Sequence, residues 1–253
     1  MRHYLTIVSQ EIRTLLFSPI TYVAAVLFLL VMGGIFTVIL EMYAKAPQEK
    51  APAFIFFQSF WIPVFFMVPA LTMKCFAEER RMGTLETLLT TPVSTAEVVL
   101  GKFTAAYLFY LLLWASTLGF HYILQVYARD VRYLDSGPLV GGYLFIAVSG
   151  LLFIAVGVLA SSLTRSYEVA AILSFTLLFS LIFGLRFLGD ASVLNNGLLQ
   201  PVKSAVDTLQ VFNHVEDFTS GVIDTRQVIF YVTGAVLTLL FSILGVEAKI
   251  LNG

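Results

Sequence analysis

The sequence predicts an all-α polytopic membrane protein, and its composition and hydropathy pattern lead to this fold class. Hydrophobic residue types make up 58% of the 253 residues, charged types make up only 12%, and the mean hydropathy is +0.89. Soluble domains carry about 25% charged residues, so a soluble fold of this length could not hide so much apolar surface. Backbone groups in hydrocarbon must bond within their own segment, and the short alternating segments of a transmembrane barrel are absent. The spans are therefore predicted as helices.

Six segments are long and apolar enough to cross a bilayer, for which a helix needs about twenty residues. The fifth is the weakest, because Arg186 falls near its end, where its side chain can reach the interface. We assign the whole chain, 1–253, to one transmembrane domain. The expected spans are 20–40, 54–73, 103–126, 139–163, 169–188 and 228–246.

Residues 1–18 are expected to form an amphipathic helix ahead of the first span. Apolar side chains recur at helical spacing on one face, and polar side chains occupy the other. Pro19 should end this helix with Ser18 extended, because the residue before a proline avoids the α region. Such a helix fits the membrane interface, although a plain leader that anchors the terminus is an equal alternative. The apolar face is Leu5, Val8, Ile12, Leu15 and Leu16, and the polar face is Ser9, Gln10, Glu11 and Arg13.

The second span is rich in aromatic residues. These side chains could line a route for a lipid-like cargo, or they could simply face lipid, which is the interpretation we favour. They are Phe54, Phe56, Phe57, Phe60, Trp61, Phe65 and Phe66.

A charged stretch between the second and third spans is the most informative part of the chain. It runs CFAEERRMGTLETLLTTPVSTAEVVLGK from Cys75 to Lys102, between two apolar segments. We expect the loop 77–98 to lie in water, with Glu78 and Glu79 in the first turn of a helix, where the helix dipole favours anions. A polar helix that is joined to membrane spans at both ends can pass motion to them or receive it from them.

Local sequence signals indicate that this loop is ordered. The Thr91-Pro92 pair should stop its first helix, because the residue before proline avoids the α region. Ser94 and Glu97 then fit a capping box, which starts a second helix that continues into the third span. The loop thus offers a surface to a soluble partner, although a capped cytosolic loop without a partner is the plain alternative. The apolar stripe of its first helix is Met82, Leu85 and Leu89.

Two further connections differ in length. The fourth and fifth spans are joined by a short polar stretch, in which Arg165 and Glu168 could make a second contact on the side of the charged loop; a simple polar turn is the alternative. The segment 189–227 on the other side is long and contains many apolar residues. We expect it to form short helices that rest on or dip into the outer leaflet and end near Gly221.

Small residues at four-residue spacing suggest close contacts between helices. Ala115 and Gly119 form such a pair in the third span, and Gly157 and Ser161 form one in the fourth. Because small residues are common in membrane helices, each pair could also occur without a contact.

Several classes of protein are excluded or disfavoured by what the sequence lacks. No phosphate-binding G-x-x-x-x-G-K-[ST] motif occurs, since Gly101-Lys102 is followed by Phe103 and has no glycine at the required offset. A net charge of −1 excludes a strongly basic nucleic-acid binder, and one cysteine excludes an intrachain disulfide framework. Three scattered histidines show no metal-ligand spacing, so no cofactor or metal is expected. No nucleophile–base–acid set for an intramembrane enzyme is evident.

Three stretches of the chain resemble the ABC-2-type permeases, which are membrane subunits of ATP-binding-cassette exporters. The most specific is the loop string FAEERRMGTLETLLTTPVSTAEVVLGKF. The opening LLFSPITYVAAVLFLLVMGGIF and the late FNHVEDFTSGVIDTRQVIFY are also similar to that family. The resemblance covers nearly the whole chain. It is closest to the branch of the gliding-motility permeases and the membrane subunit for nitrous-oxide-reductase maturation.

The resemblance implies a multi-pass protein of the prokaryotic cytoplasmic membrane with both termini in the cytosol. The Lys and Arg count, eight against seven on the two sides, leaves the orientation open by itself. The family also implies a dimer with a second copy or a paralogue, and a separate cytosolic ABC ATPase subunit that binds ATP and grips the charged loop as a coupling helix. The contact positions that the resemblance implies are Glu78, Glu79, Arg80, Arg81, Gly83, Thr84, Glu86 and Leu89. Arg165 and Glu168 remain the second contact suggested by the short polar connection.

The function expected on these grounds is the permease subunit of an ATP-driven exporter, embedded in the lipid bilayer and without ATPase activity or nucleic-acid binding of its own. The alternative is a membrane anchor or assembly subunit that docks a cytosolic machine without moving cargo. ATPase stimulation by a cargo molecule in vesicles separates the two. The sequence does not name the cargo.

Overall fold

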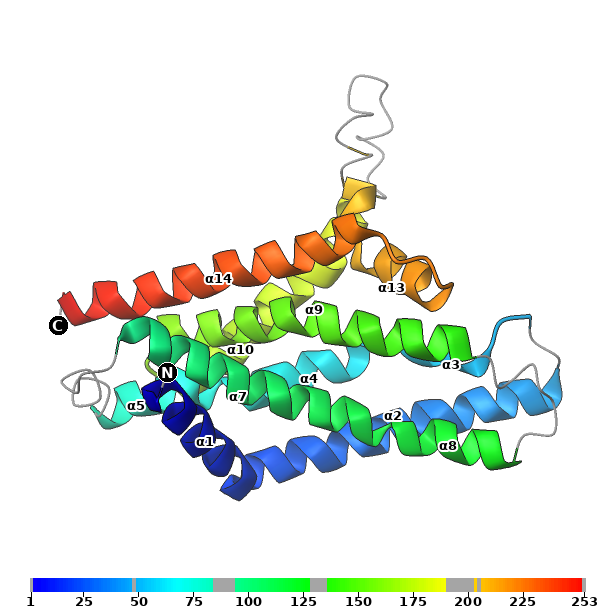
Figure 1. The fold of residues 1–253 in the computed structure, drawn as a ribbon, viewed down its shortest axis with the longest axis horizontal. Helices are drawn as coiled ribbons and strands as arrows, with labels where there is room; N and C mark the ends of the chain where they lie inside the picture. The colour runs from blue at the N-terminus through cyan, green and yellow to red at the C-terminus, as the bar shows by residue number, and fades with distance from the viewer. Residues whose placement is uncertain are drawn as a thin grey trace.

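The computed structural model describes residues 2–46, 49–83, 94–127, 136–189, 203 and 206–251, and all statements below concern these residues. They form helices and no strands (Figure 1). Among them, six helices are long and apolar enough to cross a membrane. The predicted fold class, an all-helical protein with six candidate spans, is therefore confirmed.

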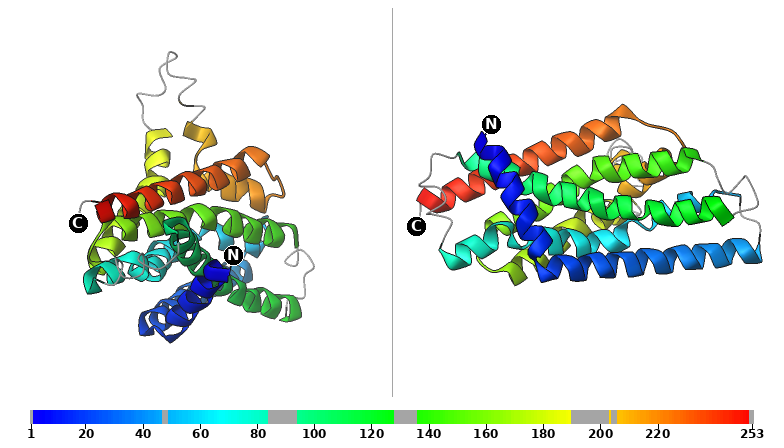
Figure 2. Two further views of the ribbon diagram at one scale, coloured as in Figure 1. Left: turned by 60° about the vertical axis from the view of Figure 1, so that its left-hand side comes forward. Right: turned by 60° about the horizontal axis from the view of Figure 1, so that its bottom comes forward.

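The first helix, α1 (Arg2–Phe17), lies across the bundle, as the right-hand view of Figure 2 shows. Ser18 is extended, with φ −80° and ψ 121°, and Pro19 opens the long helix α2 (Pro19–Lys45). Both features match the prediction from the Ser-Pro pair. Proline suits this position because the first residues of a helix need no N–H partner within it. The chain therefore turns sharply between a crosswise helix and the first span.

The second candidate span, Trp61–Met82, is built from two consecutive helices, α4 (Trp61–Thr72) and α5 (Lys74–Met82). The short helix α3 (Pro52–Gln58) precedes it. The predicted placement of Glu78 and Glu79 in a first helical turn is wrong, because α5 begins at Lys74, immediately after α4. No glycine or proline lies between the two to stop the helix, so the polar stretch extends the span. Gly83 ends α5 in the left-handed region at φ 69°, which glycine adopts without strain.

The third span begins at the predicted capping box. The Ser94 Oγ accepts the Glu97 N–H at 3.3 Å, and the Ser94 N–H donates to Glu97 Oε2 at 3.2 Å. From there α7 (Thr95–Ser116) and α8 (Leu118–Tyr127) run with a bend at Thr117, whose hydroxyl donates to the Trp114 carbonyl at 2.6 Å. The capping box therefore fixes where the span starts.

The remaining spans are α9 (Ser136–Leu163), the α10–α11 unit, and α14 (Thr225–Leu251). A five-residue π-helical turn, Ser180–Gly184, joins α10 (Tyr167–Phe179) to α11 (Leu185–Gly189). The long segment between the fifth and sixth spans contains the short helix α13 (Val211–Thr219), and the chain turns after it at Gly221, whose φ is 83°. A short helix ending near Gly221 agrees with the expectation.

Helix α9 is at the centre of the bundle and contacts α3, α4, α5, α7, α10, α13 and α14. A Cβ atom on Gly157 would lie 2.3 Å from the Thr72 Oγ1, so the two backbones approach closely there. Ser161, one turn later, bonds to the start of α5. The Gly157–Ser161 pair is therefore a helix contact, as predicted. A Cβ on Gly119 would meet nothing within 4 Å, so the other small-residue pair makes no close contact through Gly119.

The aromatic residues that the sequence places in the second span are largely core residues of the structure. Phe56, Phe57 and Phe60 are completely buried, and Phe54 is nearly so. These four side chains line neither a route for cargo nor a lipid-facing surface, so both expectations are wrong for them. A protein-facing and a lipid-facing position are equally apolar, and sequence pattern alone does not separate them.

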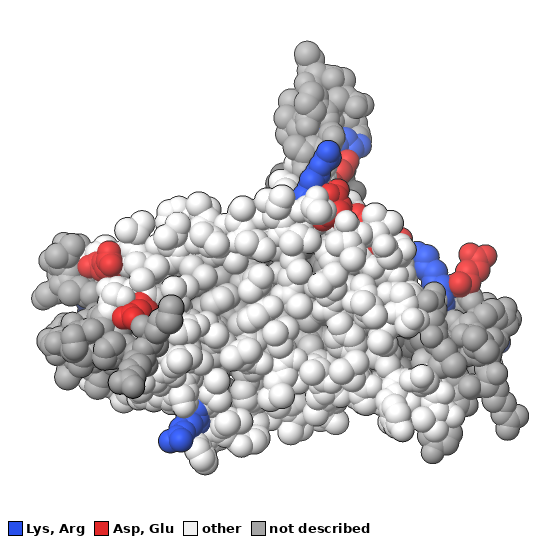
Figure 3. Space-filling view, viewed as in Figure 1, with Lys and Arg blue, Asp and Glu red and all other residues white. Residues whose placement is uncertain are grey.

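The two ends of the bundle differ from its middle. Figure 3 shows a broad surface without charged residues between the ends, while Lys, Arg, Asp and Glu gather toward the ends and around α13. The α5 end carries α1, α5, the start of α7, the α9–α10 connection and the end of α14 (Figure 1). The α13 end carries α3, α13 and the ends of α2 and α8. Both termini thus lie at the α5 end, as an even number of spans requires.

Candidate functional site

The charged residues at the α5 end fall into an inner group and an outer group. The inner group centres on Lys102, whose side chain is only 3% exposed. Its Nζ lies 2.5 Å from Glu11 Oε1 of α1 and 2.7 Å from Glu79 Oε1 of α5. We call Glu11, Lys102 and Glu79 the ion triad. It joins α5 and α7 to α1, which is 91 residues from Lys102 in the sequence at Glu11.

The ion triad corrects two expectations. Glu79 does not lie in water, and Glu11 does not face away from the bundle, because both carboxylates turn inward to the ammonium group. The physical reason is Lys102, which sits two turns into α7 on a covered face. A buried ammonium without a counter-charge is strongly unfavourable, so the two acidic side chains are drawn to it.

Lys102 and Glu11 were missed as site residues by the sequence analysis. The available signal was weak: a lysine two turns inside a predicted helix that is otherwise apolar, and acidic residues on two neighbouring segments. Opposite charges of this kind can pair, but only the placement of α1 across α7 brings them together.

The outer group lies on α5 and on the α9–α10 connection. Arg81 is exposed, and its guanidinium lies 5.1 Å from the centre of the Tyr167 ring. Arg80 is half-buried, and its guanidinium nitrogens have no hydrogen-bond partner among the described residues. Arg80 lies close enough to the like charge of Arg165 to interact with it electrostatically. Arg81 interacts in the same way with the opposite charge of Glu168. The structure thus brings both predicted contact segments to one surface, although Thr84, Glu86 and Leu89 lie outside the described residues.

The start of α5 is fastened to α9 by one hydroxyl group. The Ser161 Oγ accepts the N–H groups of Phe76 at 3.0 Å and Ala77 at 3.2 Å, and donates to the Met73 carbonyl at 3.0 Å. These bonds lie at the junction of α4 and α5 and are buried. The junction therefore has a defined geometry.

Replacing Ser161 by Ala should lower the free energy of unfolding by about 1–2 kcal/mol, because the junction loses its interhelical hydrogen bonds. The matched control is Ser162→Ala. Ser162 is equally buried, but its hydroxyl donates only to the Leu159 carbonyl of its own helix. Its loss should cost on the order of 0.5 kcal/mol or less. Denaturant titration in detergent measures both, and equal effects of the two substitutions would contradict the fastening role.

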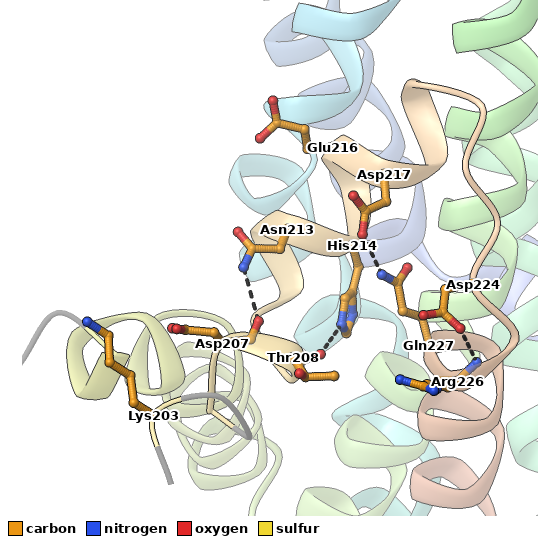
Figure 4. Close-up of a pocket in the computed structure, with 10 residues that line it drawn as sticks. All are labelled: Lys203, Asp207, Thr208, Asn213, His214, Glu216, Asp217, Asp224, Arg226 and Gln227. Atoms are coloured by element: carbon orange, nitrogen blue, oxygen red, sulfur yellow. Dashed lines mark hydrogen bonds between the residues drawn. The ribbon is translucent and has the colours of Figure 1, made fainter. Parts of the chain in front are cut away.

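A cavity of about 280 Å³ lies beside the ion triad, between α1, α4, α5 and α7. A larger polar cavity, about 760 Å³, opens at the α13 end (Figure 4). There the His214 Nδ1 is 2.9 Å from the Tyr231 hydroxyl and its Nε2 is 2.7 Å from the Thr208 carbonyl. Burial lowers the pKa of His214 from its usual value. Among the described residues, no group of His, Cys, Asp and Glu could hold a metal ion.

Comparison with protein families identifies the chain. The model of the ABC-2 family transporter proteins matches residues 5–248, which is nearly the whole sequence. The chain belongs to the ABC-2 family of transporter proteins. No curated protein matches this ABC-2 protein. Membrane components of this family generally work with an ABC ATPase, and the α5 end of the ABC-2 protein is the candidate site for that partner.

Proposed function

We propose that this ABC-2 protein is the permease subunit of an ATP-driven exporter, and that a cytosolic ATPase docks at its α5 end. The observation that carries the proposal is α5 itself, a polar helix that directly continues a span and is bonded to α9 and α7. A push on such a helix from a soluble partner reaches the spans without an intervening flexible loop. In this arrangement the α5 end and both termini face the cytosol of a prokaryotic cell.

The docking surface combines α5 with the α9–α10 connection. Glu78, Arg80, Arg81 and Gly83 form its first part, and the neighbouring Thr84, Glu86 and Leu89 extend it along the chain. Glu79 contributes differently, since its carboxylate is held by Lys102 inside the bundle. The exposed guanidinium of Arg81 is suited to a carboxylate of the ATPase, because Arg binds carboxylates through two parallel hydrogen bonds. The second part is Arg165 and Glu168.

The transport path is proposed to form between this chain and a second copy or a paralogue. The spans α2, α10 and α14 are the least enclosed within one chain, so their apolar faces are available to a partner or to lipid. We also propose that the chain belongs to the branch of the gliding-motility and nitrous-oxide-reductase-maturation permeases. Membership of that branch does not name the cargo.

Replacing Arg81 by Glu tests the docking surface. Arg81 is exposed, and surface substitutions usually change stability by less than about 0.5 kcal/mol, so the variant should insert and melt normally. It should lose co-purification with the ATPase, because like charges at an interface cost several kcal/mol. The ATPase is identified by its phosphate-binding motif and its ATP hydrolysis after affinity purification from native membranes.

The matched control for Arg81→Glu is Arg226→Glu, which makes the same change at an exposed position of the α13 end. It should leave the yield of the complex unchanged. Equal yields of complex from both variants and the unmodified chain would overturn the proposed docking surface.

A further inference from the structure

The ion triad has a geometry that a purely local salt bridge would not need. One ammonium group, on α7, binds carboxylates from two other helices, α1 and α5. We infer that Lys102 is a positioning residue that makes α1, α5 and α7 move as one body when the ATPase acts. The inference rests on the proposed function and extends it, because it assigns the N-terminal helix to the moving part.

We expect the two salt bridges of the ion triad to stay intact while the helices around the triad move. Hydrogen bonds between ionised partners are about twice as strong as neutral ones. Lys102 is almost completely buried, so releasing either carboxylate would take one of two charged hydrogen bonds from an ammonium group that water cannot reach, and releasing both would leave it without a counter-charge. A displacement of α5 is therefore expected to carry Glu79, Lys102 and Glu11 with it.

Close packing between α1 and α7 provides independent support. A Cβ atom on Gly101 would lie 2.6 Å from the Ile7 Cγ2, so the two helices touch at that glycine. The Tyr4 hydroxyl lies 2.8 Å from the Thr104 Oγ1. Three successive points, Tyr4, Ile7 and Glu11, therefore fix α1 along the first turns of α7.

The contact of α5 with α9 is of a different kind. It combines packing along the two helices with the neutral hydrogen bonds of Ser161 at the α4–α5 junction, whereas the bond of α5 to α7 is charged and lies two to three residues further along. Neutral bonds at the junction permit a change of angle there at lower cost. In the inferred movement the junction at Ser161 is the pivot and Lys102 is the rigid connection.

A disulfide between α1 and α7 tests whether these helices move together. Ile7→Cys and Gly101→Cys are combined with Cys75→Ala, which removes the natural thiol. The Cβ built on Gly101 lies 3.2 Å from the Ile7 Cβ, close to the spacing of about 3.5–4.5 Å that disulfides need. In vesicles with the ATPase, the oxidised complex should hydrolyse ATP within about twofold of the reduced complex, less than the change expected from losing a coupling residue. Inactivation on oxidation that a reductant reverses would overturn the inference.

Two substitutions that remove a negative charge test the triad directly. They also test the inference if the double-cysteine variant does not accumulate in the membrane. Glu11→Gln and Glu79→Gln each leave one carboxylate for one ammonium, so a neutral pair remains. Each should change the kcat of ATP hydrolysis by the complex by about threefold or more, as found for residues on coupling networks. The KM for ATP and the yield of complex should stay unchanged. Glu247→Gln, an exposed carboxylate on α14 at the same end, is the matched control and should alter none of these values.

The outcomes separate the possible explanations. A purely structural triad predicts a lower melting temperature and yield with an unchanged kcat per complex, and that result overturns the inference while the proposed function stands. If the unmodified chain binds no ATPase, the proposed function fails, and the inference fails with it. A changed kcat in Glu11→Gln is the most specific support, because Glu11 lies on a helix outside the docking surface.

Discussion

Replacing Lys102 by Met should lower the free energy of unfolding by about 3 kcal/mol, at the lower end of the range for breaking a buried ion pair, because the substitution leaves two partly buried carboxylates without their counter-charge. Methionine has nearly the same length as lysine, so the loss reflects charge rather than volume. Denaturant titration of the purified chain in detergent measures the effect. This is the largest change expected from any single substitution considered above.

A compensating variant distinguishes charge from packing. Combining Lys102→Met with Glu11→Gln and Glu79→Gln removes all three charges, and replacing a complete buried ion cluster by uncharged groups is often nearly neutral. The triple variant should therefore recover most of the stability that Lys102→Met loses. If Lys102→Met melts like the unmodified chain, the ion triad is not the buried cluster described above.

Replacing Gly141 by Ala should be the second most damaging change. A Cβ atom at Gly141 would lie 1.9 Å from the Phe218 carbonyl oxygen, a backbone atom of α13 that cannot rotate away. Either α13 or α9 has to move, and overpacking of this kind typically costs about 1–3 kcal/mol, occasionally more. The melting temperature in detergent and the exposure of α13 to proteolysis check the result.

The matched control is Gly119→Ala, the same substitution in another helix at the same end. A Cβ there would meet nothing within 4 Å, so alanine should be neutral or stabilise by up to about 1 kcal/mol through its helix propensity. Equal behaviour of the two alanine variants would contradict the close contact between α9 and α13.

Features with a local cause could be predicted from the sequence. The extended Ser18, the turn at Pro19 and the capping box of Ser94 and Glu97 depend on neighbouring residues only, and the structure has them as expected. The Gly157–Ser161 contact was also predictable in kind, because small residues allow helices to approach. Its partner, the α4–α5 junction, was not predictable.

Features that depend on three-dimensional placement were missed. The start of the polar helix was placed too late, since a change from apolar to charged residues marks the membrane boundary and not a helix boundary. Glu79 was expected in water because its neighbours are charged, yet Lys102 turns it inward. The pairing depends on α1 crossing α7, and nothing in the sequence of either helix specifies that crossing.

Site-specific photo-crosslinking in native membranes tests the central claim most directly. A benzophenone side chain placed at Arg81 of α5 should crosslink to a protein with the phosphate-binding motif of an ABC ATPase. The same probe at Arg226, which is also exposed but lies at the α13 end, should not crosslink to that protein. Crosslinking of the ATPase from Arg226 and not from Arg81 would contradict the proposal that the α5 end receives the ATPase.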